Sequence, residues 1–153
     1  MSRLMGIDYG DKRIGISLTD SLNIIASPYL TLKNDNNIFL NILDICKEKN
    51  VGSIIIGMPL NKNDEIGFAA KKVIKFMNSF IEFSIKEGLK LDFYEQDENF
   101  STKYAYETMK NIKVKNKNQK NIIDSIASAN ILKEFMASKK KIIYDFEKYK
   151  DIV

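Results

Sequence analysis

The stretch that decides the fold is LMGIDYGDKRIGISLT, residues 4–19. It contains two apolar runs, 4–9 and 14–19, separated by residues 10–12 (Gly-Asp-Lys), a combination that favours a tight turn. Asp8 interrupts the first run just before the turn, so its carboxylate projects from the end of a predicted strand rather than from a solvated face. We therefore expect two consecutive strands joined by a turn, with an acid at the end of the first.

The rest of the chain alternates between strand and helix patterns. Further strands are expected at 28–32, 53–57 and 89–94, and helices at 37–49, from 66 to Gly88, from 102 and from 121. This order predicts an α/β fold, in which a mixed five-stranded sheet has helices on both faces. We find no repeat and expect one domain, residues 1–138, followed by a loosely ordered charged tail, residues 139–153.

The composition narrows the chemistry that the chain can perform. Its 153 residues include no histidine and a single cysteine, which excludes Ser-His-Asp and Cys-His catalysis and any Cys/His zinc site. Cys46 lies in an apolar helical pattern, so we expect it to be a small buried residue. Carboxylates that bind hard cations remain as the candidate chemistry.

Charge and hydropathy predict a cytoplasmic protein with a polyanionic partner. The N-terminus lacks the pattern of a signal peptide, and no apolar run approaches the roughly 20 residues that span a membrane. The formal net charge is +4, and residues 103–120 alone contain six lysines against one acid. Within that stretch we expect Lys113, Lys115 and Lys117 to contact phosphates, with a solvated loop as the alternative.

Two further acids lie next to apolar segments, where a carboxylate is unfavourable for packing. Glu98 follows the strand-like run 91–94, and Asp124 lies in the apolar stretch 122–127, which indicates a helix that packs inward. Each acid also fits a structural role, because Asp8 can open a turn, Glu98 can be a surface residue and Asp124 can favour the first turn of a helix. If the three converge, they repel one another unless a cation holds them.

Four ordered blocks resemble the YqgF family, also called RuvX, of Holliday junction resolvases and pre-16S ribosomal RNA nucleases. The blocks are Gly6-Ile7-Asp8-Tyr9-Gly10 with Lys12-Arg13-Ile14-Gly15, Ile55-Ile56-Gly57-Met58-Pro59-Leu60-Asn61, Asp97-Glu98 with Ser101-Thr102, and Ile123-Asp124 with Ala127. The resemblance covers almost the whole chain and implies a ribonuclease H-like fold, in which carboxylates from the first strand, a later strand and a final helix meet.

The resemblance also implies the site residues. It assigns Asp8, Glu98 and Asp124 to a catalytic set that binds Mg²⁺ or Mn²⁺, since divalent ions activate water and stabilise the leaving oxygen in phosphodiester hydrolysis. Within the matching blocks, the candidates for contact with nucleic acid are Lys12, Arg13, Asn61 and Ser101. One departure concerns substrate contact, because Asn99 stands where the family usually has an arginine that can bind phosphate.

The expected function is a metal-dependent nuclease that processes the 5′ end of pre-16S ribosomal RNA. The alternatives are a resolvase acting on branched DNA and a noncatalytic nucleic-acid-binding module. A phosphotransfer enzyme of the sugar-kinase type has a similar first loop but needs two such domains, which 153 residues do not supply. We expect a monomer, since a resolvase requires a twofold dimer with an apolar contact patch that the sequence does not indicate.

Overall fold

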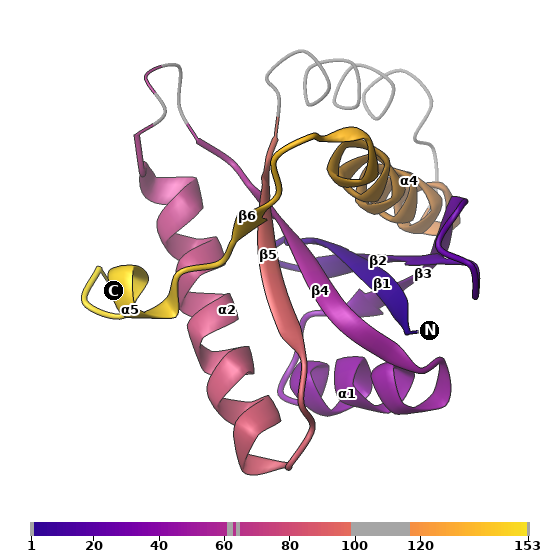
Figure 1. Ribbon diagram of the computed structural model, residues 1–153, viewed down its shortest axis with the longest axis horizontal. Helices are drawn as coiled ribbons and strands as arrows, with labels where there is room; N and C mark the ends of the chain where they lie inside the picture. Colours follow the sequence, from indigo (N-terminus) through magenta and orange to yellow (C-terminus); the bar gives the residue numbers. More distant parts are fainter. Residues whose placement is uncertain (1, 61–62, 64, 99–116, 153) are drawn as a thin grey trace.

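The computed structural model describes residues 2–60, 63, 65–98 and 117–152, and of residues 117–120 it describes the backbone alone. The elements follow one another as β1 (Arg3–Asp8), β2 (Arg13–Thr19), β3 (Ala26–Lys33), α1 (Ile38–Glu48), β4 (Val51–Met58), α2 (Phe68–Lys86), β5 (Asp92–Asp97), α4 (Lys117–Ala137), β6 (Ile142–Ile143) and α5 (Phe146–Tyr149) (Figure 1). Of the helices in these ranges, none has the length and apolar composition needed to cross a membrane.

The strands form one mixed sheet in the order β3-β2-β1-β4-β5-β6. β1, β4 and β5 run parallel to one another, whereas β2 and β3 continue from β1 as antiparallel neighbours and β6 pairs antiparallel with β5. The predicted α/β fold with a mixed sheet is therefore confirmed. The sheet has six strands rather than five, because a short strand forms in the segment predicted as a tail.

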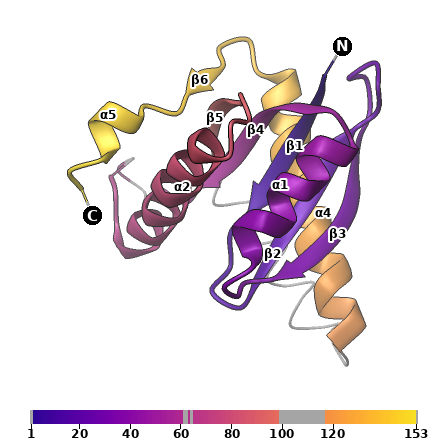
Figure 2. The same ribbon diagram turned by 90° about the horizontal axis from the view of Figure 1, so that it is seen from below.

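Helices cover both faces of the sheet, as expected, with α1 and α2 on one face and α4 on the other (Figure 2). Alternation of side chains along β1 assigns Met5 and Ile7 to a large apolar core shared with α1 and α2. A smaller apolar cluster lies under α4 and contains Ile55 and Leu132. The predicted burial of Cys46 is confirmed, and that burial raises the pKa of its thiol to about 12.

Glycines on three neighbouring strands let α4 approach the sheet closely. A Cβ added at Gly6 of β1 would lie 2.8 Å from the carbonyl oxygen of Ser128, and one at Gly15 of β2 would overlap the backbone of Asp124. One at Gly57 of β4 would lie 2.5 Å from Ile131 Cδ1. Real Cβ atoms are not found at such short distances from other atoms. The close packing of α4 on the sheet therefore requires glycine, which has no side chain, at these three positions.

The observed limits of β5 differ from the predicted strand at 89–94. Gly88, with φ of 76°, ends α2 as predicted, and Leu89 N–H donates to the Ser84 carbonyl at 3.0 Å in the hydrogen-bond pattern typical of glycine-terminated helices. The next residues carry the chain back from helix to sheet. The strand therefore begins only at Asp92 and extends to Asp97.

The segment 139–153 is not the loosely ordered charged tail that the sequence suggested. It contains β6 and α5, and Tyr144 and Tyr149 are both 4% exposed. The Tyr144 hydroxyl donates to Asn78 Oδ1 at 2.7 Å, and the Tyr149 hydroxyl donates to Glu95 Oε1 at 2.8 Å. Two buried tyrosines thus attach this segment to α2 and β5, although most residues around them are charged.

We expect Gly15→Ala to lower the free energy of unfolding by roughly 1–3 kcal/mol, because the new methyl group overlaps backbone that cannot rotate away. Gly67→Ala is the matched control, since nothing lies within 4 Å of the Cβ that this change adds. Urea unfolding of both variants measures the difference. Equal losses in the two would show that the close approach of α4 is not required.

Glu95 should make stability depend on pH. Burial raises the pKa of its carboxyl, with the hydrogen bond from Tyr149 opposing the rise, so the folded protein keeps this proton to a higher pH than the unfolded chain. The resulting stabilisation is complete below the ordinary glutamate pKa and is lost as pH rises through the folded-state value. Glu95→Gln should remove that loss in urea unfolding measured from pH 4 to 8. An unchanged pH profile would contradict this assignment.

Candidate active site

The C-terminal ends of three parallel strands form the edge of the sheet at which the predicted acids lie. Asp8 is the last residue of β1, and Glu98 directly follows β5. The Glu98 N–H donates to the Met58 carbonyl at 3.0 Å, which holds Glu98 against the end of β4. Asp8 and Glu98, which are ninety positions apart in the sequence, therefore lie at the same end of the sheet, on the two strands that flank β4.

Asp8 and Glu98 also lie on the same face of the sheet. Gly6 contacts α4, and Asp8, two residues further along β1, has its side chain on that same face. A Cβ at Gly57 would lie 2.7 Å from Glu98 Oε1, so the Glu98 carboxylate covers this glycine beside α4. Gly57 therefore provides space for the Glu98 carboxylate as well as for the helix.

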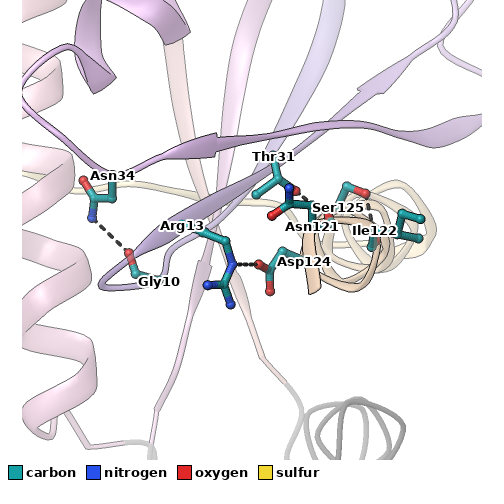
Figure 3. A network of polar contacts seen from close by, with 8 residues as sticks. All are labelled: Gly10, Arg13, Thr31, Asn34, Asn121, Ile122, Asp124 and Ser125. Atoms are coloured by element: carbon teal, nitrogen blue, oxygen red, sulfur yellow. Dashed lines mark hydrogen bonds and ion pairs between the residues drawn. The ribbon is translucent and has the colours of Figure 1, made fainter. Parts of the chain in front are cut away.

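Asp124 is the acid that α4 contributes. Its backbone lies over Gly15, which is the cross-strand partner of Asp8. Its side chain is only 10% exposed and forms an ion pair in which Arg13 Nε donates to Oδ2 at 2.8 Å (Figure 3). The first turns of α4 are further attached to the sheet by the Thr31 hydroxyl, which donates to the Asn121 carbonyl.

The donor set suits a hard divalent ion in its chemistry. Mg²⁺ and Mn²⁺ favour carboxylate oxygens, and the Asp124 carboxylate already pairs with a cation, the Arg13 guanidinium. Within the part of the chain that the structure describes, however, no three or more acidic or cysteine side chains are grouped so that they could hold a metal ion. The three acids share a face and an edge, and their role as metal ligands stays a prediction.

The turn between β1 and β2 carries two of the predicted nucleic-acid contacts. Lys12 is exposed, whereas Arg13 is partly buried by its contact with Asp124. Asn34 Nδ2 donates to the Gly10 carbonyl at 2.9 Å and fixes the turn to the end of β3 (Figure 3). Outside the described residues lie Asn61, Ser101, Lys113 and Lys115, together with the side chain of Lys117.

Sequence reasoning missed a pair of serines that join α4 to the sheet. Ser128 Oγ donates to the Gly6 carbonyl at 2.7 Å and lies 2.9 Å from Ser17 Oγ, with both side chains fully buried. Small residues at alternate positions, Gly15 and Ser17, were the available signal, since they mark a strand face that another element approaches closely. The pairing of Arg13 with Asp124 left no comparable signal in the sequence.

Comparison with known proteins agrees with this architecture. A family model described as "RuvX: Holliday junction resolvase" matches residues 2–138. A candidate pre-16S rRNA nuclease of Malacoplasma penetrans is 33% identical over 139 residues, which cover 91% of this chain and 96% of that protein. A protein of Endomicrobium trichonymphae with the same name is 37% identical over 139 residues, covering 89% of this chain and 96% of the relative.

Among solved structures, Thermus thermophilus RuvC in complex with a Holliday junction substrate is similar, with a TM-score of 0.56 at 13% sequence identity. The match covers 94% of this chain and 100% of that one. At this identity the likeness shows the shared ribonuclease H-like fold. The family model and the sequence relatives each extend over nearly the whole chain, and the protein therefore belongs to the RuvX family.

Proposed function

We propose that this protein is a metal-dependent nuclease that hydrolyses phosphodiester bonds at the 5′ end of pre-16S ribosomal RNA in the cytoplasm. The observation that carries the proposal is the shared position of Asp8, Glu98 and Asp124 on the α4 face, at one edge of the sheet. The names of the relatives from Malacoplasma and Endomicrobium support ribosomal RNA as the substrate.

In this proposal the three carboxylates hold Mg²⁺ or Mn²⁺. When bound, such an ion lowers the pKa of a water molecule and neutralises charge on the leaving oxygen. Lys12 and Arg13 supply positive charge beside the acids for the phosphates of the substrate, and the lysine-rich stretch 103–120 extends that charge along the chain. The remaining proposed contacts to nucleic acid are Asn61, Ser101, Lys113, Lys115 and Lys117.

A second candidate activity is cleavage of four-way DNA junctions, which the description of the matching family model favours. A junction resolvase makes two symmetric cuts and therefore needs two active sites related by a twofold axis. We propose instead a monomer that cuts one strand at a time, for which a single set of acids beside a basic turn is sufficient.

We expect Asp8→Asn and Glu98→Gln each to slow RNA cleavage at least about a hundredfold, because loss of a metal ligand removes several kcal/mol of transition-state stabilisation. The melting temperatures of these two variants without metal should be unchanged or higher, because each substitution removes repulsion between the carboxylates of Asp8 and Glu98, which lie on the same face. Asp124→Asn should be inactive as well, but it should melt at a lower temperature because it leaves the Arg13 guanidinium without its carboxylate.

Asp92→Asn is the matched control for these variants, because Asp92 is an exposed acid at the opposite end of β5. It should cut RNA at the wild-type rate. Wild-type cleavage by Asp8→Asn, Glu98→Gln or Asp124→Asn, in assays containing Mg²⁺ or Mn²⁺, would remove that residue from the site.

The substrate can be tested by offering three nucleic acids to the same preparation. With Mg²⁺ or Mn²⁺ present, we expect cleavage of a single-stranded 5′-extended 16S precursor and little cleavage of a four-way DNA junction. Size-exclusion chromatography with light scattering should give the mass of a monomer, and an unrelated single-stranded RNA measures selectivity. A stable dimer that nicks junctions in pairs and leaves RNA intact would support the resolvase instead.

A further inference from the structure

Two residues predicted to bind different ligands bind each other in this structure. Arg13 is a candidate for contact with phosphate and Asp124 is a candidate metal ligand, yet Arg13 Nε lies 2.8 Å from Asp124 Oδ2. They come from β2 and α4 and are 111 positions apart in the sequence. While this ion pair persists, the charge of each side chain is largely compensated by the other.

The surroundings of Asp124 explain why it needs a cation. The side chain is 10% exposed, and a carboxylate removed from water is costly unless positive charge and hydrogen bonds compensate it. In the structure, the Arg13 guanidinium supplies that charge. The guanidinium therefore occupies the role that a divalent ion has in the proposed active site.

We propose that Arg13 and the divalent ion exchange at Asp124, so that loading the ion releases the Arg13 guanidinium to bind a phosphate of the RNA. This inference rests on the proposed nuclease function and adds a control over when the phosphate-binding charge becomes available. A guanidinium and a divalent ion on one carboxylate repel each other strongly in a partly buried site. The two cations therefore compete for Asp124.

The position of Arg13 permits this exchange. It is the first residue of β2, directly after the exposed turn, and its side chain is 24% exposed. The backbone of Arg13 is held in place by pairing with Lys33 of β3, and the preceding turn is attached through Gly10 to Asn34. The exchange therefore moves only the side chain of Arg13. Arg13 also offers a fixed charge close to the acids, which Asn99 lacks at the position where the family usually has arginine.

The first test measures binding of Mn²⁺ by isothermal titration calorimetry without RNA. We expect Arg13→Gln to bind Mn²⁺ at least about tenfold more tightly than wild type, because the competing charge is gone. Arg13→Lys keeps the charge and loses the planar Nε–H donor, so its affinity should lie between the two. Arg13→Lys also serves as the measurement to use if Arg13→Gln folds poorly, which circular dichroism checks.

Lys72→Gln is the matched control. It removes one positive charge and breaks the exposed ion pair between Lys72 and Asp11, whose nitrogen–oxygen distance is 3.0 Å. Because this pair does not involve a predicted metal ligand, the affinity for Mn²⁺ should equal that of wild type. A tenfold gain in Lys72→Gln as well would mean that net charge alone controls Mn²⁺ binding, and it would overturn the exchange.

The second test measures binding of single-stranded RNA with a cleavage-resistant backbone at several salt concentrations. With Mn²⁺ present, the logarithmic salt slope of wild type should exceed that of Arg13→Gln by about one unit, which corresponds to one phosphate contact. Without Mn²⁺ the two slopes should coincide, because Arg13 is then held by Asp124. A difference that is the same with and without Mn²⁺ would contradict release of Arg13.

The outcomes separate this inference from the proposed function. If wild type binds Mn²⁺ and cuts RNA, but Arg13→Gln binds Mn²⁺ equally or more weakly, then Arg13 orients Asp124 and stays on it, and only the exchange is wrong. If wild type neither binds Mn²⁺ nor cuts RNA, the proposed nuclease function is itself wrong.

Discussion

The close approach of α4 to the sheet is the constraint on which the candidate site depends. Gly6, Gly15 and Gly57 lie under the helix on three adjacent strands, and a methyl group at any of them would meet atoms of α4. The contact is reinforced by Ser128, whose hydroxyl donates to the Gly6 carbonyl. The distance between the helix and the sheet sets how close Asp124 comes to the strand ends that carry Asp8 and Glu98. The packing of α4 against the sheet therefore also positions the acids of the candidate site.

The ion pair between Arg13 and Asp124 compensates the charge that this packing places against the sheet. A helix that brings an acid against a sheet must also compensate its charge, and Arg13 does so from the strand that contains Gly15. The residue that permits the approach and the residue that neutralises the acid are two positions apart and lie on the same face of β2. The Arg13 guanidinium beside Asp124 is thus part of the folded structure.

On the face of the sheet covered by α2, the charged composition of the last segment led to a wrong prediction. Residues 139–153 are rich in lysine and acids, and this composition predicted a loose tail. Tyr144 and Tyr149 are nevertheless buried against α2 and β5, where their hydroxyl groups meet Asn78 and Glu95. The two buried tyrosines and the pairing of β6 with β5 attach this charged segment, while the charged side chains around them can remain in water.

The sequence by itself indicated the candidate chemistry and determined the order of the elements from β1 to β5 and the presence of α4. The helix expected from residue 102 lies outside the described residues, and β6 and α5 were not predicted. The absence of histidine directed attention to carboxylates, and the turn after Asp8 predicted the first two strands with nearly their observed limits. Only the tertiary structure decided that Asp8 and Glu98 share a face, that Asp124 lies over Gly15, and that Arg13 is its partner. These relations depend on strand order and helix docking, which arise from contacts between residues about a hundred positions apart, whereas sequence patterns report local periodicity.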